Sequence, residues 1–129
     1  MTLRCFCCRR SQNVHWYLDQ TLHKPWTAQY LFEPCVGLTV AQCHYIIGGA
    51  ASQWGETADV SDLMQTIWPR AGAVGERLWS ARGVNDSEAA LPRYIAFRCL
   101  LNRRGFAAAP ALNEVARAAP HGPGSCYGQ

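Results

Sequence analysis

The feature that most constrains the fold is residues 46–56, where two isoleucines precede two glycines and then a tryptophan and a glutamate. Ile46 and Ile47 are β-branched residues, which favour a short buried strand. The glycines that follow mark a place where the backbone turns or approaches another group closely. Trp54 and Glu56 then lie in a loop, and a helix is predicted after it. The stretch therefore predicts a strand, a loop and a helix, which is the repeating unit of α/β folds.

The side chains beyond this strand are of the kind that holds a sugar ring. The apolar face of a sugar stacks on an indole, and its hydroxyls donate hydrogen bonds to a carboxylate. Trp54 and Glu56 supply these two groups. The alternative is a core tryptophan beside a solvated charge, and the pair taken alone favours this alternative.

Three sequence words in a fixed order carry a resemblance to a known family. Residues 16–19 read WYLD, residues 48–56 read GGAASQWGE, and residues 68–80 read WPRAGAVGERLWS. These words resemble the C-terminal end of the catalytic barrel of family 20 glycoside hydrolases, the β-N-acetylhexosaminidases. The resemblance covers residues 16–113, with a further point of similarity at Cys126. It implies an α/β fold in which the chain forms the last two strand-helix units and the closing helix of a TIM (β/α)8 barrel.

The resemblance implies hydrolysis of terminal N-acetylhexosamine residues by substrate-assisted catalysis. In that reaction the sugar's 2-acetamido carbonyl attacks the anomeric carbon, while a glutamate protonates the leaving oxygen and an adjacent aspartate orients the acetamido group. The sequence contains no Asp-Glu dipeptide to match this pair. Because a complete barrel needs ~250 residues, we expect a C-terminal fragment that is inactive alone. If the chain did turn over substrate, Asp59 or Asp62 would have to be the acid.

What the resemblance does imply for this chain is part of a sugar-binding subsite. Tyr17 matches the tyrosine that donates a hydrogen bond to the acetamido carbonyl and so stabilises the cyclic intermediate. Asp19 matches a carboxylate near the sugar hydroxyls. Trp54 matches the indole at the floor of the subsite, and Glu56 matches the carboxylate that binds a hydroxyl.

Before residue 46 the sequence predicts little regular structure. Residues 14–18 are expected to form a shortened strand. A helical turn is expected between Pro25, which suits its start, and Pro34, which stops it. Its aromatic residues, Trp26 and Tyr30, are assigned to the core rather than to substrate contact. Residues 36–44 are expected to form a loop.

A helix is predicted to begin at Pro69 and to run to residue 78 or 79, because proline suits the first helical position. The helical period predicts a buried face formed by four residues: Ala71, Val74, Leu78 and Trp79. The charged residues of this helix are expected either on a solvated face or, by the resemblance, in a structural network of ion pairs: Arg70, Glu76 and Arg77.

A second helix is predicted over residues 88–104, with Gly105 as its stop. One of the residues Asn85, Asp86 and Ser87 caps its start. The same three residues form an N-glycosylation acceptor sequence at Asn85, which has meaning only if the chain is secreted.

The chain has seven cysteines, an odd number that leaves at least one outside intramolecular disulfides. The resemblance implies a disulfide between Cys99 and Cys126. The pairing of the other cysteines stays open: Cys5, Cys7, Cys8, Cys35 and Cys43. The first three, with His15, are only a weak candidate for a metal cluster, and we expect no metal and no cofactor.

Composition narrows the class of protein and its partners. A hydrophobic content of 49% and a charged content of 16% exclude a disordered polymer, and no apolar run approaches a membrane span. A net charge of +3 with scattered arginines gives no support for nucleic-acid binding. The resemblance implies N-acetylhexosamine-terminated glycans as ligands and a homo- or heterodimer with a family member. It also implies a lysosomal or extracellular location, although no signal peptide is visible.

Three segments are expected along the chain. Residues 1–13 are rich in cysteine and arginine, lie outside the resemblance and are expected to be disordered. Residues 14–113 form the barrel part, and residues 114–129 form a tail tied back by a disulfide. Two other identities stay open. One is a catalytically inactive truncated homologue that acts as a carbohydrate-binding or subunit-interaction module. The other is a small cysteine-rich secreted protein, but cysteine spacing explains none of the three sequence words.

Overall fold

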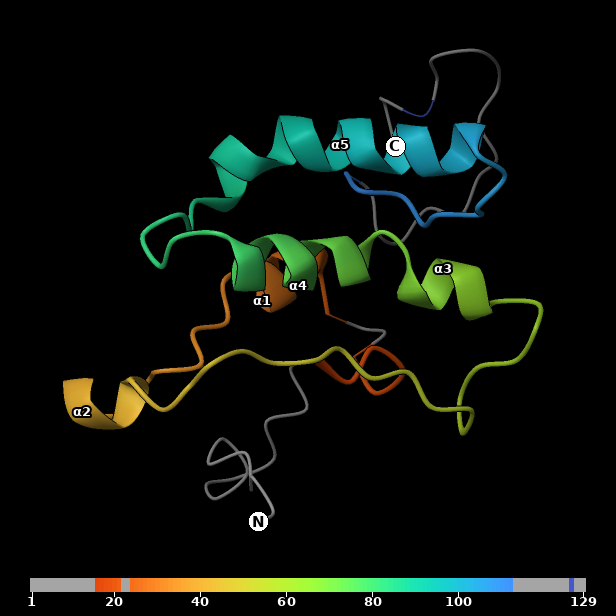
Figure 1. Cartoon of the computed structure of the whole chain (residues 1–129). Coiled ribbons are helices and arrows are strands. Elements are labelled where there is room, and N and C mark those ends of the chain that lie inside the picture. The colour runs from red at the N-terminus through yellow and green to blue at the C-terminus, as the bar shows by residue number, and fades with distance from the viewer. Residues whose placement is uncertain (1–15, 22–23, 113–125, 127–129) are drawn as a thin grey trace.

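The computed structural model describes residues 16–21, 24–112 and 126. This part of the chain forms five helices: α1 (Trp26–Tyr30), α2 (Val40–Cys43), α3 (Leu63–Ile67), α4 (Arg70–Trp79) and α5 (Ser87–Arg103). Figure 1 shows α5 lying along one side of α4, while the extended chain between α2 and α3 runs along the other side. None of these helices is both long enough and apolar enough to cross a membrane, as far as the described residues go. The predicted segment 1–13 and all of the predicted tail except Cys126 lie outside the described residues.

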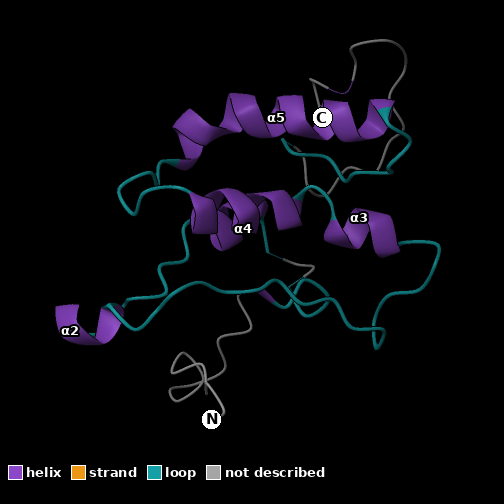
Figure 2. Ribbon diagram, viewed as in Figure 1, coloured by secondary structure: helices purple, strands orange, loops and turns teal. Residues whose placement is uncertain are grey.

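The predicted strands are not formed in the part of the chain that the structure describes, which contains only helices and loops (Figure 2). The two segments meet in parallel at one position, where Tyr17 and Ser52 form an isolated bridge. The amide of Leu18 donates to the carbonyl of Ser52 at 2.8 Å, and the amide of Ser52 donates to the carbonyl of Trp16 at 2.8 Å. A barrel strand pairs with a neighbour on each side, whereas these described segments pair only with each other. The described residues therefore form a helical arrangement with one parallel bridge, which is consistent with the prediction of an incomplete part of an α/β fold, and they do not form the barrel itself.

The core forms where α1, α4 and α5 meet. Six buried side chains make up one cluster: Trp26, Tyr30, Ala73, Ala90, Tyr94 and Ala111. The rings of Trp26 and Tyr94 stack with centroids 4.0 Å apart, and the indole Nε1 of Trp26 donates to the carbonyl of Ala111 at 3.2 Å. The prediction that Trp26 and Tyr30 belong to the core is confirmed.

Helix α4 begins at Arg70, with Pro69 as its N-cap. Its buried residues are Arg70, Ala73, Val74 and Arg77. The predicted buried face is right for Val74 and wrong for Trp79, which is 93% exposed. The helical period is kept, but the buried face is turned toward the two arginines. Both guanidinium groups find backbone carbonyl acceptors in the interior, and this offsets the cost of burying them.

Helix α5 follows the prediction closely at both ends. Asp86 is the N-cap, and its carboxylate accepts hydrogen bonds from the amides of Glu88 at 2.9 Å and Ala89 at 3.1 Å. Gly105 follows the C-cap with a φ of 86°, a left-handed conformation that glycine adopts without a Cβ penalty. The helix is therefore bounded by the two kinds of residue that its sequence indicated.

The chain after α5 is held against the helices by main-chain contacts and a disulfide. The amide of Ala109 donates to the carbonyl of Trp68 at 2.9 Å. Arg98 donates through Nε to the carbonyl of Ala109 at 3.1 Å and through Nη1 to the carbonyl of Cys126 at 2.6 Å. Cys126 is joined to Cys99, with Cα atoms 5.7 Å apart. This is the pair that the resemblance implies.

Two short helices lie where none was predicted. Helix α2 lies within residues 36–44, which were expected to form a loop. There the amide of Gln42 donates to Oγ1 of Thr39 at 3.2 Å, and the amide of Thr39 donates to Oε1 of Gln42 at 2.9 Å. Helix α3 precedes α4 and is also about one turn long. Helices this short depend on local capping rather than on a long apolar period.

Candidate functional site

The structure brings the two segments that carry the predicted site residues side by side. The first attachment is the parallel bridge at Tyr17. In the second, the hydroxyl of Thr57 donates to the carbonyl of Asp19 at 3.3 Å. Trp54 and Glu56 lie on the loop between these two attachments. All four predicted residues therefore lie on one pair of neighbouring segments.

Three of the four predicted side chains are accessible to a ligand. Trp54 is 55% exposed, and Tyr17 and Glu56 are exposed as well. The alternative of a core tryptophan beside a solvated charge is therefore wrong for Trp54. An exposed indole beside an exposed carboxylate offers both an apolar face and an acceptor, as sugar recognition requires.

Asp19 differs from the other three because its carboxylate is buried without a partner. The residue is 2% exposed, and neither Oδ1 nor Oδ2 accepts a hydrogen bond from any described residue. A carboxylate removed from water without donors is destabilising. The position therefore requires donors that the described residues do not supply.

Gly49 lets the segment that leads to Trp54 approach residues 16–19 closely. A Cβ atom at Gly49 would overlap the ring carbon Cζ3 of Trp16. The indole is held in place because its Nε1 donates to the carbonyl of Gln29 at 3.3 Å and its ring meets Phe32 edge to face at 5.0 Å. The close approach predicted at the glycine pair is confirmed.

Arg70 lies beneath the turn formed by residues 17–21. Its Nη2 donates to the carbonyls of Leu18 at 2.5 Å and Thr66 at 2.6 Å, and its Nη1 donates to the carbonyl of Thr21 at 2.7 Å. The residue is buried. The expectation of a solvated face is therefore wrong for Arg70, because backbone carbonyls receive its charged donors in the interior.

Thr21 and Gln29 extend this buried polar cluster. The hydroxyl of Thr21 donates to the carbonyl of Tyr17 at 2.8 Å and accepts from Nε2 of Gln29 at 3.1 Å. Both residues are completely buried. Sequence reasoning missed the cluster, because its members are polar residues that pattern analysis assigns to the surface.

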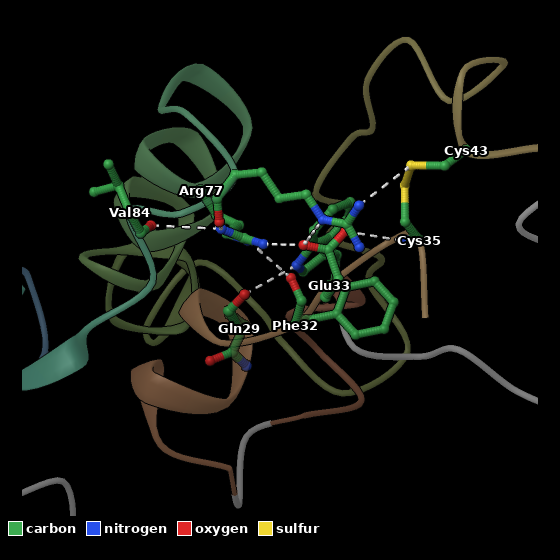
Figure 3. Close-up of polar contacts among 9 residues, drawn as sticks. Gln29, Phe32, Glu33, Cys35, Cys43, Arg77 and Val84 are labelled. Atoms are coloured by element: carbon green, nitrogen blue, oxygen red, sulfur yellow. Dashed lines mark hydrogen bonds and ion pairs between the residues drawn. A yellow bond between two sulfur atoms is a disulfide. The ribbon is translucent and has the colours of Figure 1, made fainter. Parts of the chain in front are cut away.

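A second polar cluster, centred on Glu33, joins the end of α1 to the end of α4 (Figure 3). Oε2 of Glu33 forms ion pairs with Nη2 of Arg77 and with Nε of Arg82, the latter at 3.2 Å. Oε1 of Glu33 accepts from the amide of Cys35 at 3.0 Å, and Nε of Arg77 donates to the carbonyl of Phe32 at 3.1 Å. The predicted structural network of ion pairs is confirmed for Arg77.

Cys35 and Cys43 form a disulfide beside this cluster, with Cα atoms 5.3 Å apart (Figure 3). The sequence left the pairing of both residues open. The disulfide closes the loop that contains α2 and anchors the start of the segment leading to Trp54. It lies near Arg82, whose Nη1 approaches Sγ of Cys43 at 4.0 Å.

Glu76 also takes part in an ion pair, although a more exposed one. It pairs with Arg93 at 2.5 Å and accepts a hydrogen bond from the hydroxyl of Tyr30 at 3.1 Å. Burial and the neighbouring negative charge of Glu76 raise the pKa of Tyr30 above 10.0. This cluster lies on the core side of α4 and plays no part in the candidate site.

Asp59, the first carboxylate that follows Glu56 along the chain, does not favour acid catalysis. Oδ1 of Asp59 accepts from the hydroxyl and the amide of Ser61 at 2.6 and 2.7 Å. These hydrogen bonds lower the pKa of Asp59 below its ordinary value. A carboxyl group held ionised is poorly suited to donating a proton.

Within residues 16–21, 24–112 and 126, no group of three or more His, Cys, Asp or Glu side chains could hold a metal ion. The weak candidate cluster of Cys5, Cys7, Cys8 and His15 lies outside these ranges.

Comparison with known proteins gives a consistent set of matches. The sequence pattern of the glycosyl hydrolase family 20 catalytic domain matches residues 6–82, so the match begins before residue 14, where the barrel part was predicted to start. The chain is 50% identical to beta-hexosaminidase 1 of Arabidopsis thaliana over 96% of its length and 24% of that protein. It is 44% identical to beta-hexosaminidase subunit beta of Homo sapiens over 74% of its length and 17% of that protein. The chain thus spans about a quarter or less of these curated relatives.

Proposed function

Because this chain belongs to glycosyl hydrolase family 20, we propose that it supplies part of the N-acetylhexosamine subsite of a β-N-acetylhexosaminidase. The observation that carries the proposal is the pairing of two segments. The bridge at Tyr17 and the contact between Thr57 and Asp19 attach the two ends of the loop that presents Trp54 and Glu56. The names of the relatives, which are beta-hexosaminidases, support the same ligand class.

Each of the four side chains has a role in this proposal. The indole of Trp54 stacks on the apolar face of the sugar, and Glu56 accepts a hydrogen bond from a hydroxyl. The hydroxyl of Tyr17 donates to the acetamido carbonyl and stabilises the charge that develops during ring closure. The unpartnered carboxylate oxygens of Asp19 accept hydrogen bonds from sugar hydroxyls, once a bound ligand has made this buried side chain accessible.

The proton donor and the orienting carboxylate are proposed to come from outside this chain. The sequence has no Asp-Glu dipeptide, and the hydrogen bonds from Ser61 lower the pKa of Asp59, which does not favour it as a proton donor. The chain is therefore proposed to bind the sugar without hydrolysing it, and the complete domain would carry out substrate-assisted hydrolysis.

The experiment that tests this proposal is a titration of the oxidised chain with N-acetylglucosamine, followed by tryptophan fluorescence. Trp54→Ala and Glu56→Gln are each expected to weaken binding by about tenfold or more, since each removes a direct contact. Trp79→Ala is the matched control, because Trp79 is also exposed but lies at the end of α4. Equal losses in Trp54→Ala and Trp79→Ala, or no binding by the parent chain, would contradict the proposal.

A subunit-interaction module is the second candidate function. Three large apolar residues within eight positions of the sequence are exposed on α2 and on the segment after it: Val40, Tyr45 and Ile47. Exposed apolar surface of this kind favours protein contacts. One relative is named a subunit, beta-hexosaminidase subunit beta. A homo- or heterodimer of this kind predicts a concentration-dependent mass in light scattering, and Ile47→Ser should reduce it. A monomer at all concentrations, alone and with a full-length relative, would contradict this candidate.

A lysosomal or extracellular location is also proposed. Its supports are two disulfides, which persist in oxidising compartments, and the exposed Asn85 in its acceptor sequence before α5. Expression in secretory cells is expected to give a mass shift that an endoglycosidase removes and that both Asn85→Gln and Ser87→Ala abolish. A parent chain without this shift would contradict glycosylation at Asn85.

A further inference from the structure

We propose that Arg70 is a positioning residue for the sugar subsite, because its guanidinium group holds the turn that carries Tyr17 and Asp19. The identity of the ligand rests on the proposed function, whereas the role of Arg70 in holding the turn does not depend on it. Arg70 itself does not contact the sugar in this account. It acts through the backbone of residues 17–21.

The guanidinium group of Arg70 donates to two carbonyls of the turn. Nη2 donates to the carbonyl of Leu18 at 2.5 Å, and Nη1 donates to the carbonyl of Thr21 at 2.7 Å. These two carbonyls lie on either side of Asp19 in the sequence, so one guanidinium group spans the base of the turn. Charge-assisted hydrogen bonds are stronger than neutral ones, and the planar fork of arginine fixes their directions.

Arg70 is itself anchored in helical structure. Arg70 is the first residue of α4, and the same side chain donates to the carbonyl of Thr66 in α3 through Nη2 at 2.6 Å and through Nε at 3.2 Å. One turn further along α4, Ala73 and Val74 are buried in the interior. The turn is therefore attached to packed helices, which hold a site more accurately than loops do.

Leu18 links Arg70 to the other half of the proposed subsite. Leu18 is bonded on both sides, since its carbonyl accepts from Arg70 and its amide donates to the carbonyl of Ser52 at 2.8 Å. Ser52 begins the loop that presents Trp54 and Glu56. Loss of the guanidinium group would leave the carbonyl of the buried Leu18 without this donor, and the Leu18–Ser52 pairing would loosen as a result.

A general contribution to stability is the competing explanation, and Arg77 is the matched comparison. Arg77 lies on the same helix and is also buried. It donates to the carbonyls of Phe32 at 3.1 Å and Arg82 at 3.0 Å, and no hydrogen bond joins it to the described residues of the 17–21 turn. A lysine at either position keeps the charge but loses the fork. Stability alone would make the two substitutions equivalent.

The test compares Arg70→Lys with Arg77→Lys in the full oxidised chain by amide hydrogen exchange. Arg70→Lys is expected to raise the exchange rates of the Leu18 and Ser52 amides about tenfold and those of α5 by less than about twofold. Arg77→Lys is expected to leave the Leu18 and Ser52 amides within about twofold of the parent. Equal acceleration in both variants, or none in Arg70→Lys, would overturn the proposal.

A second variant covers the case in which Arg70→Lys does not fold. Arg70→Gln removes the buried charge while keeping two amide donors, and the same amides are measured in it. If both Arg70 variants lose their helical circular dichroism while Arg77→Lys keeps it, Arg70 is a general stability residue and the positioning role is overturned.

The ligand part is tested by titrating N-acetylglucosamine into the same variants. Arg70→Lys is expected to weaken binding about tenfold without touching the sugar, and Arg77→Lys by less than about twofold. If the turn loosens but the affinity stays unchanged, the positioning role in binding is overturned. If the parent chain does not bind the sugar, the proposed function fails, and the exchange rates alone decide whether Arg70 holds the turn.

Discussion

Replacing Glu33 by glutamine is predicted to destabilise the chain by about 2–3 kcal/mol. The side chain of Arg77 is 4% exposed and that of Glu33 is 20% exposed, so this ion pair is largely removed from water. Removing one partner of a buried ion pair costs about 3–5 kcal/mol, because a buried charge is left uncompensated. Arg77 keeps its hydrogen bonds to the carbonyls of Phe32 and Arg82, and the expected cost therefore falls below that range.

The measurement is urea unfolding of the oxidised chain, followed by circular dichroism, with the change in midpoint converted through a common slope. Glu76→Gln is the matched control, since it removes the same charge from a carboxylate that pairs with Arg93. That pair is more exposed, at 55% for Arg93 and 30% for Glu76, and exposed ion pairs contribute about 0–1 kcal/mol. The account predicts that Glu33→Gln costs more than Glu76→Gln by about 1–3 kcal/mol.

Equal costs would refute this reasoning. They would mean that the carboxylate of Glu33 does not offset the burial of Arg77, and that the carbonyl acceptors of Arg77 are sufficient alone. A change in the urea slope of Glu33→Gln would instead show that the variant has lost compactness, which would also contradict a purely local role for Glu33.

Three further predictions concern stability and use the same unfolding assay unless stated. Cys99→Ser should cost more than Cys35→Ser, about 3.6 against about 2.6 kcal/mol from loop entropy, because the disulfides span 27 and 8 residues of sequence; a reversed order would contradict this. The pKa of Tyr30 in the folded chain lies above its ordinary value of 10.0. The stability that Tyr30 contributes to the folded state is therefore complete below pH 10 and is lost as the pH rises through the pKa of the folded chain. Tyr30→Phe should therefore lose less stability between pH 9 and 11 than the parent chain, and identical pH profiles would argue against it. Gly49→Ala should destabilise the chain and increase the change in tryptophan fluorescence that accompanies opening of the loop. Gly75→Ala is the matched substitution, because open space surrounds its Cβ, and it should stabilise α4 by about 0.5–1 kcal/mol. A Gly49→Ala variant as stable as the parent chain would show that the close approach is not needed.

The two long helices could be predicted from the sequence because local signals agree along each of them. Helix α5 has an aspartate cap at Asp86 and a glycine stop at Gly105, and α4 has a proline before its first residue. The burial of Arg70 could not be predicted in this way. Its acceptors include the carbonyl of Leu18, which lies 52 residues away in the sequence, and no local pattern reports such a contact.

The strands were predicted from local composition, but strand formation depends on partners. Ile46 and Ile47 have the β-branched character of a strand, yet Ile47 is exposed in this chain. A parallel strand depends on a neighbouring strand for its backbone hydrogen bonds, and an unpaired edge leaves N–H and C=O groups without partners. Among the described residues, the two segments form one isolated β-bridge, at Tyr17 and Ser52. The local strand preference is therefore not sufficient to form a ladder of hydrogen bonds.

The site residues stay a prediction, although their arrangement agrees with the proposed role. The sequence motifs that resemble the family pointed to Trp54 and Glu56. The structure adds that the loop carrying them is attached at both ends to the segment that contains Tyr17. The burial of Asp19 could not be predicted, because it results from the turn above Arg70. The Cys35–Cys43 pair also needed the structure, since an odd number of cysteines allows several pairings.

The most direct test of the central claim is a map of backbone amide chemical shifts as N-acetylglucosamine is added to the isotopically labelled chain. The account predicts that the largest shifts fall in residues 16–21 and 52–57, and that glucose, which lacks the acetamido group, leaves the Tyr17 amide nearly unchanged. Shifts confined to α2 and residues 44–47, or no shifts at saturating sugar, would contradict the claim that this chain carries part of an N-acetylhexosamine subsite.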